Sequence, residues 1–139
     1  MARAEVDAVR PDQRAAVAFI RQARQQLRSA LLAGVDAESS FGLSYQAAIK
    51  GLTGALLAIG RRVTAGEAGH LVLIREARMR IGGDDALFDR LDRMRRTRHQ
   101  VFYEVAEVSR RELETAQRDA QALIDLSAQF VLSQNERSS

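Results

Sequence analysis

One apolar stripe along a predicted helix constrains this chain most, because an arginine interrupts it. Between residues 87 and 105, apolar side chains recur at alternating spacings of four and three, the period of one helix face. The stripe consists of Leu87, Leu91, Met94, Val101 and Val105, and Arg98 stands at the position that completes it. A guanidinium on a buried seam is costly unless it is paired or faces a polar cleft. Arg98 is therefore held by a buried acid or lies in a groove that binds an anion.

The composition predicts a helical protein without a membrane segment. The chain has 139 residues, enough to bury a core, with one proline and no cysteine. The absence of cysteine excludes disulfides and thiolate metal sites and fits a reducing compartment. No apolar run approaches the ~20 residues of a membrane span, and the N-terminus has no apolar signal-peptide segment. We therefore expect a soluble, cytoplasmic protein.

The basic residues are almost all arginine. The formal net charge is only +3, and Lys50 is the only lysine among 21 basic residues. A GC-rich genome explains such a bias, and so does phosphate recognition by the planar guanidinium. Five arginines crowd the segment 90–98 against only two acids, Asp89 and Asp92, so a local positive field is expected there. These arginines are Arg90, Arg93, Arg95, Arg96 and Arg98.

Apolar spacing and capping residues predict an all-α fold with five helices and no strands. The expected helices cover about residues 12–32, 39–62, 70–81, 84–104 and 109–134. Their boundaries follow from Asp12, Gly34, Ser39 or Ser40, Gly82-Gly83, Asp84 or Asp85, and the capping box of Ser109 and Glu112. We expect an antiparallel bundle of four to five helices in one domain, residues 11–133, between a flexible N-terminus (1–10) and a flexible tail (134–139).

The second helix is predicted to be the central one. It is apolar on one side through Tyr45 and Leu52, and on another through Leu56. Gly51 and Gly54 each weaken it by roughly 1 kcal/mol. We expect these glycines to permit the close approach of another helix, with a ligand contact as the alternative use.

No common enzyme motif is present. The chain has no glycine-rich phosphate loop, no metal-spaced cluster and no nucleophile elbow, so neither a metal nor another cofactor is expected. His70 follows Gly69 at a helix start and is interpreted as a cap or surface residue. His99 shares a helix face with Arg95 and is either solvated or a proton carrier with a pKa near ~6.5 beside an anion-binding arginine.

The segment from Leu91 to Tyr103, Leu-Asp-Arg-Met-Arg-Arg-Thr-Arg-His-Gln-Val-Phe-Tyr, resembles the fourth-helix signature of the HEPN family. These small helical proteins occur in toxin–antitoxin and other defence systems. Members commonly show an arginine-rich approach, then Arg-Asn or Arg-Asp, three variable residues, and His or Tyr. A long alanine-rich second helix, a Gly-His opening a short third helix and a Ser-x-x-Glu opening the last one extend the resemblance over residues 12–132. It implies an up-and-down helical fold.

The resemblance also implies roles for individual residues. Arg98 matches the motif arginine, and His99 stands where the family usually has Asn or Asp. Tyr103 stands where ribonuclease members place the catalytic histidine. In those members, paired motifs from two subunits form a cleft for metal-independent RNA cleavage, in which the arginine holds the phosphate and the histidine moves a proton. A tyrosine with a pKa of ~10 is a poor base at neutral pH, so this departure puts catalysis in doubt.

A second alignment of the motif uses Arg93, followed by five residues and His99. Arg93 lies outside the apolar stripe, so this register places it away from the expected cleft. We therefore prefer Arg98 as the motif arginine and Arg95 as the partner of His99.

The expected site consists of Arg95, Arg98, His99 and Tyr103 at the interface of a homodimer. Two facing guanidiniums repel, so the cleft would take an anion or a carboxylate such as that of Glu104. Three further residues are expected near it: Gln100 and Phe102 as lining, and Tyr45 from the second helix.

Three hypotheses for the function follow. The first is a degenerate HEPN protein of a toxin–antitoxin or defence-type system that binds RNA, a nucleotide or a partner protein, such as a cognate toxin or antitoxin, without catalysis. The second is a metal-independent HEPN ribonuclease that uses Arg98 for phosphate binding and His99 as acid and base, with Tyr103 in the altered motif. The third is a structural helical interaction protein in which Arg98 only forms a salt bridge.

Overall fold

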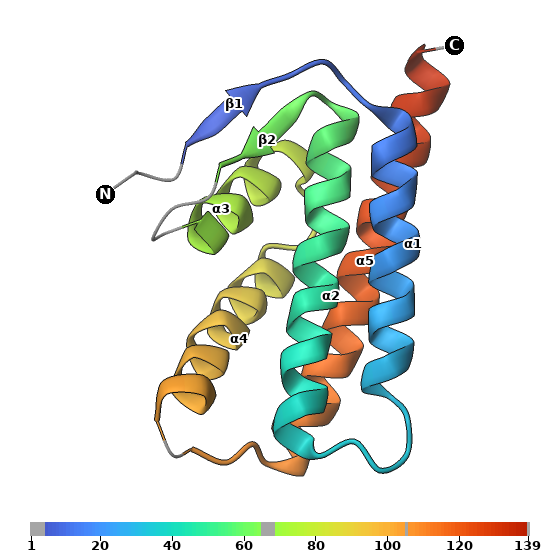
Figure 1. The fold of residues 1–139 in the computed structure, drawn as a ribbon. Helices are drawn as coiled ribbons and strands as arrows, with labels where there is room; N and C mark the ends of the chain where they lie inside the picture. Colours follow the sequence, from blue (N-terminus) through green and yellow to red (C-terminus); the bar gives the residue numbers. More distant parts are fainter. Residues whose placement is uncertain (1–4, 65–68, 105, 139) are drawn as a thin grey trace.

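Five helices and one short β-ribbon form the described part of the chain in a computed structural model (Figure 1). The structure describes residues 5–64, 69–104 and 106–138. The helices are α1 (Gln13–Ala30), α2 (Ala37–Ala58), α3 (Gly69–Ile81), α4 (Asp85–Tyr103) and α5 (Arg110–Ser138). The strands are β1 (Val6–Ala8) and β2 (Arg61–Val63), which pair antiparallel. The helical content confirms the all-α prediction, and no helix of these residues is long and apolar enough to span a membrane.

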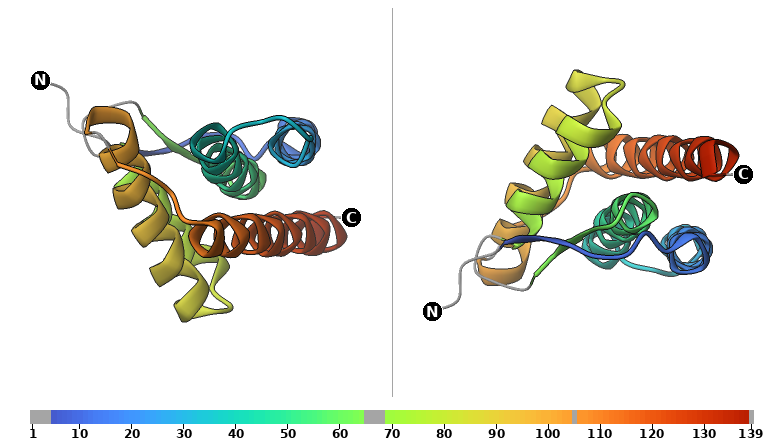
Figure 2. Two further views of the ribbon diagram at one scale, coloured as in Figure 1. Left: turned by 90° about the horizontal axis from the view of Figure 1, so that it is seen from below. Right: turned by 90° about the horizontal axis from the view of Figure 1, so that it is seen from above.

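The long helices alternate in direction. α1 and α4 run one way, and α2 and α5 run the other way, with the shorter α3 inserted between α2 and α4 (Figure 1). Viewed end-on, α3 and α4 cross obliquely beside α2 and α5 instead of extending the row that α1 begins (Figure 2). α2 packs against all four other helices. The expected up-and-down arrangement is therefore observed, with α2 at its centre.

The burial of α2 on several sides makes it the core element. Tyr45, Leu52 and Leu56 are each at most 1% exposed, and the buried set continues from Ser40 to Ala58. Burying apolar area contributes about 25 cal/mol per Å², so a helix covered in this way supplies much of the favourable free energy of folding. Its central position, expected from the two apolar sides, is confirmed.

Side-chain caps begin the helices where the orphan backbone N–H groups need acceptors. Asp12 and Asp84 cap α1 and α4 as expected, and Ser109 and Glu112 form the expected capping box, with reciprocal bonds of 3.1 Å. The start expected for α2 was wrong. Asp36 accepts a bond of 3.0 Å from the Ser39 backbone N–H, so α2 begins at Ala37 rather than at Ser39 or Ser40.

The expectation of no strands was also wrong. α2 ends at Ala58 rather than near residue 62, because Gly60 adopts a φ of +74° and turns the chain into β2. The Val9 N–H donates to the Gly60 carbonyl at 2.8 Å, and Val6 pairs with Val63. Part of the N-terminal segment 1–10 is thus held in a strand, and α5 continues past Gln134 to Ser138.

The two central glycines of α2 lie at helix contacts. A Cβ built on Gly54 would lie 2.8 Å from Phe19 Cβ and 2.9 Å from the Ala16 carbonyl oxygen of α1. A Cβ on Gly51 would lie 3.5 Å from its nearest neighbours, Ile124 and Ser127 of α5. The close approach expected at both glycines is therefore present, and at Gly54 it leaves no room for a side chain.

Gly54→Ala should destabilise the protein by about 1–3 kcal/mol, because the α1 backbone must move away to admit a methyl group. Gly51→Ala is the matched control. It makes ordinary contacts and gains up to ~1 kcal/mol of helix propensity, so it should be neutral or stabilising. Urea denaturation measures both, and equal effects of the two substitutions would contradict the close-contact interpretation.

Candidate functional site

Arg98 lies on the half-buried seam of α4 without an acidic partner. Its guanidinium carbon is 5.6 Å from the ring centroid of Tyr45 on α2 and 5.8 Å from that of Phe102. Among the described residues, no carboxylate lies within salt-bridge distance of it. Of the two states expected for this arginine, the buried-acid alternative is therefore not observed in this part of the chain. Val105, the last position of the predicted stripe, lies outside the described residues.

Three of the four other arginines in the segment 90–98 have acidic partners, whereas Arg93, like Arg98, forms no ion pair with the described residues. Arg95 Nε donates to Asp92 at 2.9 Å, and Arg96 lies 3.7 Å from the same carboxylate. Arg90 Nε donates to the buried Asp119 of α5 at 2.9 Å. Three guanidiniums of the segment 90–98 thus form ion pairs. No carboxylate of the described residues accepts a hydrogen bond from Arg98, so its N–H donors can bind a ligand.

Tyr45 and His70 complete the environment of Arg98. The Tyr45 hydroxyl lies 2.9 Å from His70 Nδ1, and the two rings are 5.6 Å apart. Burial raises the pKa of Tyr45 above its ordinary value, although the charges of Arg95 and Arg98 act in the opposite direction. Burial lowers the pKa of His70 below 6.5, and the charges of Arg98 and Arg95 lower it further. At neutral pH, a protonated phenol and a neutral imidazole therefore stand beside the Arg98 guanidinium.

His70 is a hydrogen-bond partner of the buried Tyr45, a contact that its interpretation as a cap or surface residue does not predict. It begins α3, twenty-five positions after Tyr45, and no local pattern distinguishes it from a solvated histidine. The signal lay in Tyr45, because a buried tyrosine hydroxyl requires a hydrogen-bond partner. Three helices, α2, α3 and α4, therefore meet at Tyr45, His70 and Arg98.

His99 and Tyr103 are exposed at the C-terminal end of α4. Their rings contact each other at a centroid distance of 4.6 Å, and the Phe102 ring contacts Tyr103 at 5.2 Å. Phe102 and Tyr103 are each 71% exposed. Of the expected site residues, Arg98 thus faces Tyr45, whereas His99 and Tyr103 form an outer aromatic cluster. Phe102 touches both groups.

The remaining expected lining residues are exposed. Gln100 and Glu104 both face solvent near the end of α4, and the Gln100 carbonyl accepts the Glu104 backbone N–H at 2.8 Å. Within the described ranges, no group of three or more His, Cys, Asp or Glu side chains is placed to hold a metal ion.

Arg98→Met should change the free energy of unfolding by less than ~1 kcal/mol, because it removes only cation–π contacts at a partly exposed site and keeps an apolar stem. Arg90→Met is the matched control. It removes the same charge but leaves Asp119, whose side chain is 8% exposed, without its partner, and should cost roughly 2 kcal/mol. Urea denaturation compares them, and a loss at Arg98 as large as that at Arg90 would indicate a structural role.

His70 should make stability depend on pH. Its pKa is below 6.5 in the folded state, so the unfolded chain binds the proton first as the pH falls. The stabilisation is complete above pH 6.5 and decreases as the pH falls from 6.5 toward the folded pKa. Denaturation midpoints at about pH 7.5 and about pH 5.5 should differ less in His70→Asn than in the wild type. The same difference in both proteins would contradict the assignment.

The comparisons with known proteins identify the family. A model of the HEPN domain matches residues 16–131, from the first turn of α1 to the last part of α5. No curated protein matches the chain significantly. The family match covers most of the chain and includes every helix that surrounds Tyr45, His70 and Arg98. This chain belongs to the HEPN domain family.

Proposed function

We propose that this HEPN protein binds RNA through Arg98, whose guanidinium contacts a phosphate group of the backbone. The observation that carries the proposal is the half-buried position of Arg98 over the Tyr45 ring without a carboxylate partner among the described residues. The ring shields one face of the cation from water, and the planar fork of N–H donors matches phosphate oxygens in geometry and charge.

The aromatic residues beside Arg98 favour RNA over a simple anion. Phe102 contacts the guanidinium, and Phe102 and Tyr103 expose most of their ring surface. Unstacked bases bind to proteins largely by stacking on exposed aromatic side chains and arginine planes. A cation and two exposed rings at one helix end fit the backbone and bases of a single strand.

Binding without cleavage is the form of this function that we propose. Tyr103 replaces the histidine of ribonuclease members, and a phenol is a poor base at neutral pH. Tyr45 contacts Arg98 directly, but burial raises the pKa of its phenol. The phenol is therefore protonated at neutral pH and cannot act as a base. His99 is in ring contact with Tyr103 at the outer edge of the site.

The binding surface is proposed to lie at the interface of a homodimer, in a protein of a toxin–antitoxin or defence-type system. The exposed Phe102 and Tyr103 supply apolar area for a self-complementary contact. A two-fold axis near them would bring two copies of Arg98 together, and the repulsion between the two cations would be relieved by RNA phosphates. Sedimentation velocity of the wild type and of a Phe102→Ser variant tests the dimer.

The RNA proposal predicts that Arg98→Met weakens binding of a fluorescent single-stranded RNA roughly tenfold, or about 1.4 kcal/mol. It should also reduce the salt slope of log K by about one phosphate contact. Arg24→Met is the control, because it removes an equal charge from an exposed ion pair with Asp125 on α1 and α5. Anisotropy titrations give both quantities. Equal losses in the two variants would reduce the effect to net charge and contradict the proposed contact.

Metal-independent cleavage is the second candidate, and one observation favours it. His70 is neutral at neutral pH and close enough to Arg98 for that charge to lower its pKa, as a general base would require. The test is incubation of a structured RNA with the protein in EDTA, beside Arg98→Met, His70→Asn and His99→Asn. Intact RNA supports binding alone. Cleavage that only the wild type and one histidine variant perform would identify the other histidine as the proton carrier.

A further inference from the structure

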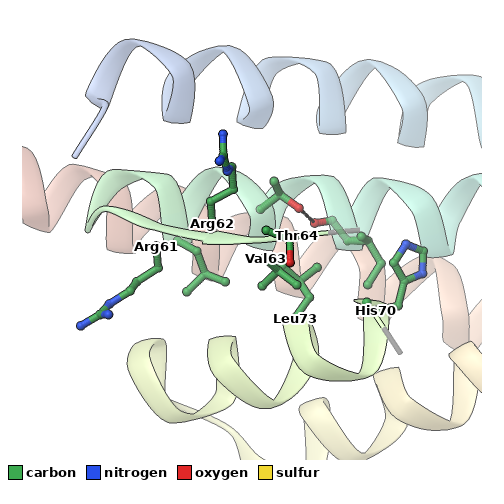
Figure 3. A pocket seen from close by; sticks show the side chains of 10 residues that line it. Arg61, Arg62, Val63, Thr64, His70 and Leu73 are labelled. Carbon is green, nitrogen blue, oxygen red and sulfur yellow. Dashed lines mark hydrogen bonds between the residues drawn. The ribbon is translucent and has the colours of Figure 1, made fainter. Parts of the chain in front are cut away.

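A pocket of about 280 Å³ opens between α2, β2 and α3, next to the site of Arg98 (Figure 3). Its floor is apolar and includes Ile49 and Leu56 of α2, Val63 of β2 and Leu73 of α3. Ligand pockets for drug-sized molecules begin near 300 Å³. This pocket therefore has room for a compact planar group and not for a long chain.

A basic side chain stands at each end of the pocket, and Thr64 lies between them. His70 stands at one end and Arg61 at the other, as Figure 3 shows. Arg62 lies 3.8 Å from Asp7, whereas Arg61 has no carboxylate within salt-bridge distance among the described residues. His70 forms a hydrogen bond with Tyr45, and the Arg98 guanidinium lies over the Tyr45 ring. The pocket thus lies between two cations, Arg61 and Arg98, neither of which has a carboxylate partner within the described ranges.

The hydrogen-bonding groups of the walls are mostly occupied. The Thr53 hydroxyl donates to the Ile49 carbonyl at 2.8 Å, and the Thr64 hydroxyl bonds to both backbone groups of Glu5. Nδ1 of His70 is occupied by Tyr45, so Nε2 is the ring nitrogen that can meet a ligand. A ligand would therefore be held mainly by shape and apolar contact. Few hydrogen bonds would be available to distinguish one ligand from another.

We propose that this pocket takes one unstacked base of single-stranded RNA, while phosphates farther along the strand in its two directions contact Arg98 and Arg61. The inference rests on the proposed RNA binding and specifies where a base goes. Both phosphates that flank a nucleotide are attached to its ribose, so a base inserted into this apolar pocket leaves the backbone at the mouth, from which the strand runs in two directions toward the two cations. Because the threonine hydroxyls of the walls already bond within the protein, binding should require a base without selecting which base.

The test compares two labelled ten-residue oligomers of equal charge, oligouridylate and the abasic ribose-phosphate chain. Wild-type protein should bind oligouridylate about tenfold more tightly. Thr53→Leu fills the pocket with a larger side chain on a good helix-forming residue and should bring the two affinities together while leaving abasic binding unchanged. Thr53→Ser is the matched control, because it keeps the hydroxyl and the open pocket, and it should retain the preference.

The outcomes separate the pocket from the other possible causes. A preference that survives in Thr53→Leu but is lost in Phe102→Leu would place the bases on the exposed Phe102 ring and overturn the pocket proposal alone. Displacement of the RNA by uridine monophosphate at a similar concentration would assign the pocket to a free nucleotide and overturn the strand proposal. Failure of the wild type to bind either oligomer would overturn both the pocket proposal and the proposed function. Thermal melting of each variant confirms that it is folded.

Discussion

The packing of α2 against α1 and α5 controls the rest of this fold. At Gly54 the α1 backbone approaches α2 so closely that a methyl group has no space, and at Gly51 α5 lies in ordinary contact. With these two helices pressed against it, α2 leaves the side that bears Tyr45 and Ile49 to α3 and α4. The hydroxyl of a buried tyrosine must still find a partner there, and the first turn of α3 supplies one in His70. The geometry of the site is thus a consequence of how tightly the opposite side is packed.

The electrostatics of α4 divide its arginines into two kinds. Arg90 satisfies the buried Asp119 and ties α4 to α5, so its charge is used in the fold. Arg98 stands at an apolar position of the seam, where the structure, as far as it describes the chain, gives it aromatic rings and no carboxylate as neighbours. Replacing a hydrophobic seam residue with such a cation costs packing, and a fold that retains it keeps a strong anion-binding group in a fixed orientation.

Periodicity predicted most of the fold because it reports on burial along one helix at a time. Spacing predicted the stripe of α4 and the two apolar sides of α2. Local residue type predicted the caps at Asp12 and Asp84. The β-ribbon could not be predicted, because Arg-Arg-Val is too short to show an alternation, and its extended form depends on pairing with residues near the N-terminus. The same limit explains the site. Arg98 interrupts the apolar spacing of its own helix, so the sequence reveals it. His70 belongs to the site because it bonds to Tyr45 on another helix, and spacing along one helix cannot show that contact.

The β-ribbon also has a consequence for the order in which the molecule assembles and opens. Val6 pairs with Val63, and the whole α1–α2 hairpin lies between them in the chain. The strands can meet only after that hairpin has folded, because closing so long a loop is entropically costly until the helices hold its ends together. Two three-residue strands add few hydrogen bonds in return, so the ribbon should form last and exchange its amide protons before the bundle does. The pocket wall that carries Arg61 and Val63 should then open before the wall formed by the buried helix α2.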